Sequence, residues 1–384
     1  MSDPDLLRLR ALEELRALER VWALLTSHRA GLKPPRLASL RSTYDRHRRE
    51  LTGIKDAPGS SGWERLATAA TDAGRFEREV FCYAIGQLLH ADGSDRPDAW
   101  AAADRLLTQL ADRTGVADPP LAGLEYELGW ESMTPLIGLV RLRYPGAGFW
   151  DLPVLAHEFG HHVLAGAAAV DPGDLLPLRE AAGRFAAEQS RHKVLWRPVF
   201  AEREDQCRRR VAELVADVFA TYAVGPAYPW CCIALRIPPD DIDRLHPEHP
   251  PWQFRVPAMI KTLRVMSARS HDGGYLEAVA DDVAGLWATV AGPCAGPVAD
   301  GLRAIGRWVG EIADALDGVT GLRYDRGWLA DGPPGAAGDP SGEWSVAHVL
   351  NAGWRWRLSS AYHTCDEVDA AERRFLGYCE LLEA

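Results

Sequence analysis

Two histidines four residues apart, His157 and His161, have the types and spacing in this sequence that most directly suggest chemistry. On a helix, residues i and i+4 lie on one face, so both imidazoles can reach a single metal ion. A hydrolytic zinc site needs a few protein ligands and one open position for water. Glu158 directly follows His157 and can take the proton of a metal-bound water. This segment therefore predicts a zinc-dependent hydrolytic site.

His162 adds a third histidine to the same segment. On a helix it faces about a hundred degrees away from His161, so we interpret it as a structural residue or a support for the ligands.

Glu213 is the best candidate for the third zinc ligand. Glu213 and Asp217 lie at i and i+4 in an otherwise apolar stretch, so one carboxylate can bind the metal while the other accepts the remaining N–H of a ligating histidine. Burying two acids without a cation is costly, which favours a metal nearby. The alternative is a helix that simply exposes two acids near its first turn.

A third group of polar residues begins at His249-Pro250-Pro251 and ends at Arg255. Histidine and arginine are donors that stabilise the oxyanion of a tetrahedral intermediate, so we consider His249 and Arg255 catalytic candidates. A turn histidine before a proline-initiated helix is the structural alternative. Tyr222 and Tyr228 are further possible donors, although aromatic residues in an apolar segment more often belong to the core.

The elements that position these residues are mostly helices. The ligand segment opens at Leu152-Pro153, with proline at a first-turn position, and the helix should run to about Ala165. The second half of residues 134 to 144 alternates and predicts a strand. Leucines at three- and four-residue spacing over residues 5 to 27 predict an amphipathic helix that needs a partner surface. Further helices are expected over residues 63 to 91, 97 to 112, 175 to 189, 200 to 224 and 253 to 269, and over most of the rest.

These patterns predict a mainly α, α+β protein. We expect a helical N-terminal region over residues 1 to 115, a zincin-like core with a small sheet over residues 116 to 270, and a helical C-terminal region over residues 271 to 384. An edge strand at 135 to 144 would offer its backbone to an extended peptide.

Composition restricts the classes of partner. The chain has 43 basic and 54 acidic residues and a net charge of −11, which argues against a general nucleic-acid or anionic-membrane binder. The seven cysteines are scattered and include no Cys-x-x-Cys pair, so we expect neither a disulfide framework nor a thiolate zinc site. With no apolar leader at the N-terminus, we expect a cytoplasmic protein.

The uncharged stretch from Val218 to Leu235 reaches the lower limit of a membrane-spanning length. Gly225, Pro226 and Pro229 interrupt it near the middle. We therefore expect two buried segments joined by a turn and no membrane span.

Taken together, the three polar groups resemble the gluzincin metallopeptidases, specifically the family of the CaaX prenyl endoprotease and the bacterial heat-shock membrane protease. The segment from Val154 to His162 is similar to that family's Ala-His-Glu-x-Gly-His helix. Residues Glu213 to Ala220 resemble its Glu-x-x-x-Asp-x-Phe-Ala helix, and residues His249 to Arg255 resemble its His-Pro-Pro-x-x-x-Arg segment. The resemblance covers about residues 135 to 265.

This resemblance implies zinc ligation by His157, His161 and Glu213, and a catalytic base at Glu158. It also implies that Asp217 supports a ligand and that His249 and Arg255 lie near the transition-state oxygen. Members usually carry transmembrane helices, whereas we expect none in this chain. A prenylated or membrane-embedded substrate is therefore not expected here. The first two groups also resemble the ImmA/IrrE-type peptidases, and neither resemblance covers residues 1 to 130 or 275 to 384.

The sequence thus predicts a zinc-dependent metalloendopeptidase that hydrolyses a protein or peptide substrate, with Glu158 as general base. Two alternatives stay open. One is a non-catalytic, zinc-stabilised helical interaction protein, although a structural site has no use for a carboxylate beside two ligands. The other is a regulatory peptidase with a single protein target, in which the N-terminal helices contact a regulatory partner.

Overall fold

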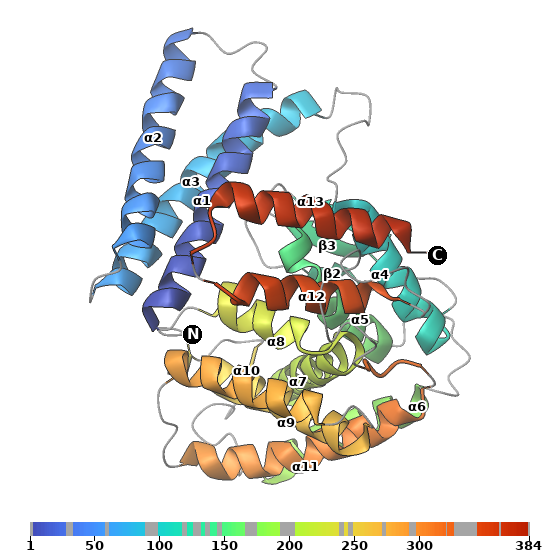
Figure 1. Cartoon of the computed structure of the whole chain (residues 1–384). Coiled ribbons are helices and arrows are strands. Elements are labelled where there is room, and N and C mark those ends of the chain that lie inside the picture. Colours follow the sequence, from blue (N-terminus) through green and yellow to red (C-terminus); the bar gives the residue numbers. More distant parts are fainter. Residues whose placement is uncertain are drawn as a thin grey trace.

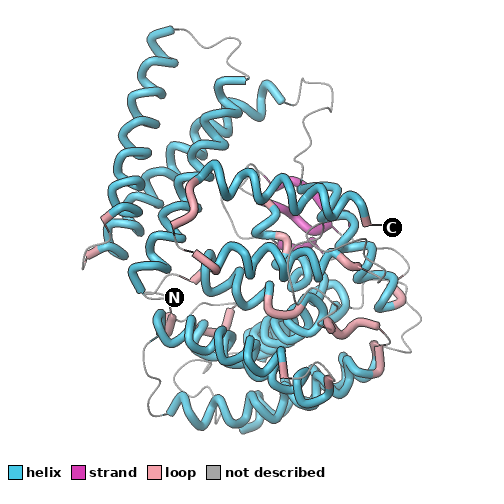
Figure 2. Tube along the Cα trace, viewed as in Figure 1, coloured by secondary structure: helices cyan, strands magenta, loops and turns pink. Residues whose placement is uncertain are grey.

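The computed structural model of the chain is built almost entirely of helices (Figures 1 and 2). It describes residues 3–27, 34–57, 61–88, 99–116, 121–125, 132–134, 139–143, 148–165, 175–192, 204–237, 242–244, 249–270, 274–291, 297–319, 321–325, 344–360 and 362–382.

The N-terminal helices form a bundle that extends from one side of the molecule (Figure 1). Its second hydrophobic cluster includes Leu15 of α1, Leu51 of α2 and Phe76 of α3. The opposite side of α1 contributes Leu6 and Leu9 to the main core, so α1 is apolar on two faces and joins the bundle to the rest of the protein. The bundle consists of α1 (Asp3–Ser27), α2 (Pro34–Asp56) and α3 (Gly62–Leu88), whereas the next helix, α4 (Ala99–Thr114), packs in the main core.

The centre of the fold is the packing of α5 (Pro153–Ala165) against α7 (Glu204–Val224). Gly160 lets the two helices approach closely: a Cβ there would lie 3.1 Å from the Cα of Ala216 and 3.3 Å from its Cβ. Helix α9 (Trp252–Arg269) packs on α7 from another side. These three helices carry His157 and His161, Glu213 and Asp217, and Arg255, so their packing decides how these side chains meet.

The remaining helices surround this centre and share its hydrophobic core. The short helix η2 (Phe149–Asp151) leads into α5, and its Phe149 and Trp150 pack against Trp354 and Phe375 from the C-terminal helices. The other elements are α6 (Leu176–His192), α8 (Ala227–Cys231), the π-helix η3 (Cys232–Arg236), α10 (Tyr275–Ala291), α11 (Pro297–Asp317), α12 (Val346–Leu358) and α13 (Cys365–Leu381).

Three short strands lie between α4 and α5 in the sequence: β1 (Leu121–Glu125), β2 (Ser132–Thr134) and β3 (Leu139–Arg143). Their order is β1-β3-β2, with β3 parallel to β1 and antiparallel to β2. Strand β3 occupies the second half of the predicted strand, whose residues 135 to 138 lie outside the described ranges. Since β3 has a neighbour on both sides, it is not the edge strand that we expected to pair with a substrate.

The expected α+β, zincin-like core with a small sheet is wrong as a fold class, because the described chain is a mainly α fold of thirteen α-helices. Strands β2 and β3 do contact α5, but α7 contacts it more extensively than any other element does, and α4 and α8 pack on it as well. Helices α9 and α12 pack on α7. Helix-on-helix packing thus supplies most of the partners that a sheet was expected to provide.

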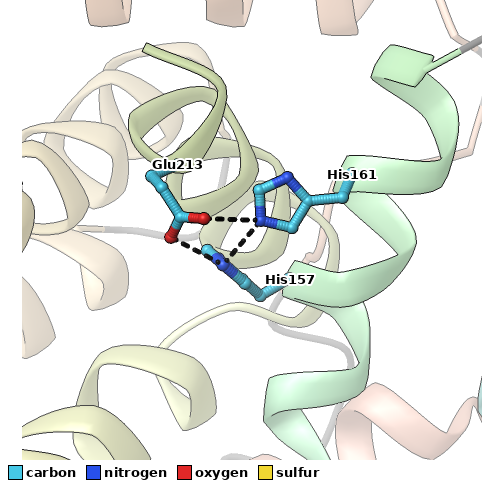
Figure 3. Close-up of side chains that lie close together, drawn as sticks. All are labelled: His157, His161 and Glu213. Carbon is cyan, nitrogen blue, oxygen red and sulfur yellow. Dashed lines mark hydrogen bonds and ion pairs between the residues drawn. The ribbon is translucent and has the colours of Figure 1, made fainter. Parts of the chain in front are cut away.

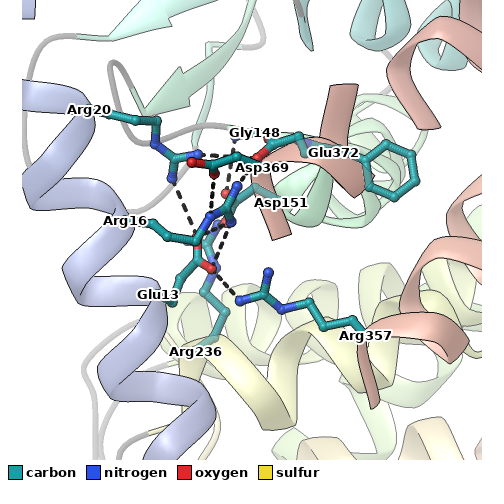
Figure 4. A network of polar contacts seen from close by, with 10 residues as sticks. Glu13, Arg16, Arg20, Gly148, Asp151, Arg236, Arg357, Asp369 and Glu372 are labelled. Carbon is teal, nitrogen blue, oxygen red and sulfur yellow. Dashed lines mark hydrogen bonds and ion pairs between the residues drawn. The ribbon is translucent and has the colours of Figure 1, made fainter. Parts of the chain in front are cut away.

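A buried ionic network ties α1 to the C-terminal helices (Figure 4). Arg16 of α1, whose side chain is fully buried, contacts Glu13, Asp369 and Glu372. The guanidinium of Arg357 in α12 donates to Glu13 at 2.6 Å. Burial raises the pKa of the Glu13 carboxyl, but the charges of Arg16 and Arg357 outweigh burial and hold this pKa well below its ordinary value.

The same network reaches the start of the ligand helix. Glu372 of α13 accepts a hydrogen bond from the backbone N–H of Phe149 at 2.8 Å, at the first residue of η2. Because η2 runs directly into α5, the N- and C-terminal helices together fix where the ligand helix begins.

In the part of the chain that the structure describes, no single helix has the length and apolar character of a membrane span. The segments Cys207–Val224 and Ala227–Arg236 reach that length and apolar character only when they are taken together. They are bent by 118° relative to each other at Gly225 and Pro226. Five cysteines of the described chain are free thiols: Cys207, Cys231, Cys232, Cys365 and Cys379.

Candidate metal centre

Helix α5 presents His157 and His161 on the face that meets α7, and α7 presents Glu213 toward them (Figure 3). Proline at the first position of α5 suits the helix start, because its missing N–H has no intrahelical partner there. The i, i+4 spacing then places the two imidazoles one above the other, with ring centroids 4.7 Å apart. The predicted pairing of two separate helices around one point is therefore present.

The three side chains form a group that could hold a metal ion. Nε2 of His161 lies 3.1 Å from Nε2 of His157 and 3.1 Å from Oε1 of Glu213, and Nε2 of His157 lies 3.4 Å from Oε2 of Glu213. Ligand atoms at about 2.0–2.1 Å from a tetrahedral ion are separated by roughly 3.3–3.4 Å. The donor atoms thus have the spacing of three corners of a metal coordination tetrahedron.

Asp217, one turn after Glu213, lies behind His157 and not at the metal position. Its Oδ1 is 3.1 Å from Nδ1 of His157, and the hydroxyl of Tyr228 donates to the same oxygen at 2.6 Å. A hydrogen bond from Nδ1–H to a carboxylate keeps the lone pair on Nε2, the atom that faces His161 and Glu213. Asp217 therefore contacts the ring nitrogen of His157 that points away from His161 and Glu213, which is the contact expected of a residue that supports a ligand.

Arg255 of α9 is buried and binds Asp217 with both sides of its guanidinium. Nε donates to Oδ2 and Nη2 donates to Oδ1, each at 2.7 Å, and the cation also lies 4.3 Å from the centre of the Trp252 ring. Burial raises the pKa of Asp217, but the charge of Arg255 and its hydrogen bonds outweigh burial and lower the pKa to about 2. Asp217 is therefore a stable carboxylate.

These contacts make the surroundings of His157 strongly favourable to positive charge. Burial lowers the pKa of His157, but the hydrogen bonds that its imidazole donates to Asp217 and Glu213 outweigh burial and raise the pKa to about 10. Glu213 and Asp217 both carry negative charge inside the protein, and one guanidinium, that of Arg255, contacts both. Without a metal ion, the protonated His157 imidazole and Arg255 balance these two charges, and an ion bound between the donor atoms would replace the His157 proton.

A pocket opens beside the group, and Glu158 is part of its wall. Glu158 directly follows His157 in α5 and is largely buried. His157 and Glu213 line the same pocket, as do Tyr228 of α8 and Trp252 of α9. The candidate base and two of the three candidate ligands thus face one shared space.

His249 also borders this pocket, with its side chain 40% exposed. Its Nδ1 lies 2.8 Å from Oε2 of Glu213, so it contacts a ligand carboxylate. Arg255 donates hydrogen bonds from Nε and Nη2 to Asp217, so it orients the carboxylate that contacts His157. The expected proximity of both residues to a transition-state oxygen stays a prediction.

Tyr228 is the site residue that the sequence indicated least clearly. Its hydroxyl contacts both Asp217 and Nδ1 of His157, at 2.6 and 2.9 Å. The signal available was a polar tip inside an uncharged stretch, three residues after Gly225, and core packing explained it equally well. Tyr222, the other candidate, donates to Asp317 of α11 instead. His162 is buried and packs against Phe159, outside the ligand group.

Comparison with known proteins identifies no relative: no family model, no curated protein and no solved structure matches this chain.

Proposed function

We propose that this chain is a zinc-dependent metallopeptidase in which His157, His161 and Glu213 hold the metal and Glu158 is the general base. The observation that supports this most is the spacing of the three donor atoms, 3.1, 3.1 and 3.4 Å, beside a pocket that Glu158 also lines. A purely structural ion would be enclosed by four protein ligands, whereas this group leaves a position toward the pocket.

The donor set favours zinc over harder cations. Two imidazole nitrogens and one carboxylate oxygen are the ligand types of catalytic zinc, while Mg²⁺ and Ca²⁺ prefer sites made of oxygen alone. The carboxylate of Asp217 at Nδ1 of His157 is the support that zinc-binding histidines usually have.

When bound, the zinc ion supplies a Lewis acid that lowers the pKa of a bound water and polarises a carbonyl. The protein's own residues then handle the protons. The Glu158 carboxylate accepts a proton from the attacking water, which leaves a hydroxide to add to the scissile carbonyl carbon. The C–N bond breaks as the Glu158 carboxyl delivers that proton to the leaving amine, so the base is regenerated. In this proposal His249, which borders the pocket, donates to the carbonyl oxygen.

The test compares the full-length protein with Glu158→Gln, both loaded with one equivalent of Zn²⁺. We expect Glu158→Gln to retain its metal, measured by elemental analysis, and to lose about 10²–10⁴-fold in kcat for hydrolysis of a peptide library. Glu180→Gln, an exposed acid on α6, is the matched control and should keep full activity. Metal-loaded protein whose hydrolysis is unaffected by Glu158→Gln would exclude the proposed mechanism.

A further inference from the structure

The wall of the pocket beyond the metal ligands is cationic. Arg236 of η3 and Arg244 line it together with Arg255, whose guanidinium is bound to Asp217, and apolar side chains form most of the remaining wall. The acids that line the pocket in the described chain, Glu158 and Glu213, both belong to the metal centre. This local excess of arginine stands in a chain with net charge −11, so it does not reflect a basic protein surface in general.

An ion pair with a residue outside the pocket holds Arg236 in place. Its Nη2 donates to Oδ1 of Asp151 at 2.5 Å, and its residue is only 9% exposed. Asp151 does not line the pocket; it borders a separate cavity against α1, and Arg236 lies between the two spaces. An arginine that is already ordered loses little entropy when it binds an anion.

Arg244 is at the entrance of the same pocket and is exposed. Its segment, residues 242 to 244, is tied to the first turn of α9, because the backbone N–H of Gln253 donates to the carbonyl of Ile242 at 3.1 Å. This bond holds Arg244 near Trp252, which lines the pocket as well. Arg236 and Arg244 thus belong to one wall of the pocket, and Arg236 is buried while Arg244 is exposed.

We infer that this wall selects peptide substrates that carry a carboxylate next to the scissile bond, bound by Arg236 and Arg244. Guanidinium groups bind carboxylates through paired, charge-assisted hydrogen bonds, and the surrounding apolar wall excludes water that would weaken them. The carboxylate is either an Asp or Glu side chain or the free C-terminus of the peptide. This inference rests on the proposed peptidase function, which it extends to a substrate class.

The first experiment profiles cleavage of a proteome-derived peptide library by the zinc-loaded full chain, with Glu158→Gln as the blank. Half of the library is amidated at its C-termini. We expect cut sites to be enriched at least about tenfold in flanking Asp or Glu, or to lie next to free C-termini and vanish in the amidated half. The first pattern assigns the pocket to acidic side chains and the second to the terminal carboxylate.

Arg244→Glu is the decisive variant, because the side chain is exposed and its reversal should not affect folding. It should lose the preference for the carboxylate and favour Lys or Arg at the same position. Arg236→Gln should weaken the preference as well. Arg49→Glu, an exposed change of equal charge on α2, should leave the profile unchanged. Cleavage with no carboxylate preference, or with a preference that Arg244→Glu does not alter, would overturn the inference and leave the peptidase intact.

A binding measurement separates the inference from the peptidase function itself. Zinc-loaded Glu158→Gln is immobilised, and the peptides it retains from the same library are identified. We expect carboxylate-bearing peptides to be enriched on this protein and not on Glu158→Gln combined with Arg244→Glu. If no peptide is cleaved but this enrichment is found, the peptidase proposal fails and the carboxylate pocket stands. If the retained peptides show no enrichment, the pocket assignment is wrong.

Discussion

Two regions of this molecule bury charge, and they balance it differently. In the network that joins α1 to α12 and α13, three carboxylates face three guanidinium groups, and each charge has its partner within the protein (Figure 4). At the metal centre, the carboxylates of Glu213 and Asp217 share the guanidinium of Arg255, next to an accessible pocket.

The difference indicates what each cluster does. A balanced set of buried ion pairs holds helices in one arrangement and has no place for a further ion. In the second cluster one of the balancing cations is a proton on His157, a side chain that could itself bind a metal ion, and that proton can be exchanged for the ion. Buried charge alone is therefore no sign of a functional site; an exchangeable proton among donor atoms beside a pocket is.

The largest expected effect separates the two clusters by their need for metal. Glu213→Gln removes a ligand and its charge, and we expect zinc affinity to fall by more than about 100-fold, since loss of a supporting residue already costs 10–100-fold. Asp369→Asn removes a carboxylate from the balanced network and should leave zinc affinity within about twofold. Competition with a chromogenic chelator measures both. Equal losses in the two variants would mean that the contrast between the clusters is wrong.

The next prediction concerns the ionic network of α1, α12 and α13, which we expect to affect stability more than metal binding. Arg16→Ala removes the fully buried cation that contacts Glu13, Asp369 and Glu372, and we expect the free energy of unfolding to fall by about 3–5 kcal/mol. Urea denaturation of the metal-free protein measures this loss. Arg49→Ala, exposed on α2, should change stability by less than about 0.5 kcal/mol.

This result also bears on the regulatory alternative. Cutting the chain near Gly115 would remove Arg16 together with Leu6 and Leu9 of the main core. We therefore expect that truncation to destabilise the protein, so point variants in α1 are the better test of regulation.

The smallest effect concerns acid. The folded-state pKa of Glu13 is depressed below its ordinary value of 4.5, so its contribution to stability is fully present above pH 4.5 and is lost as pH falls below it. We expect a loss of about 1.5–3 kcal/mol from this residue, the usual contribution of hydrogen bonds to a charged group. Denaturation midpoints between pH 6 and pH 3 should fall less steeply in Glu13→Gln than in the unaltered protein. Parallel curves would exclude Glu13 as a source of the acid dependence.

The metal ligands could be predicted because their geometry is local. His157 and His161 share a helix face by their spacing alone, and the same holds for Glu213 and Asp217 on α7. The apolar residues around each pair predicted that these faces would be buried. Only the meeting of the two pairs needed the tertiary structure, and Gly160 marks the point where α5 and α7 come close enough for it.

Other features could not be predicted from local patterns. The alternation at 139 to 143 suggested a sheet-based core, yet what packs on α5 and α7 depends on helices distant in the sequence. The sequence suggested Arg255 as a catalytic donor. Its contact with Asp217, 38 residues away in the chain, depends on how α9 packs on α7. Tyr228 is placed by the turn at Gly225, whose φ of 68° suits glycine.

The sequence by itself determined which side chains can bind a metal, because helical periodicity converts spacing into a shared face. The tertiary structure alone decided that the Glu213 carboxylate completes the group, that Asp217 and Tyr228 support His157, and that Arg236 and Arg244 share the pocket wall. The reason is physical: hydrogen bonds and charge pairs act over a few ångströms, and only the packing of helices α5, α7 and α9 brings residues so far apart in the chain within that distance.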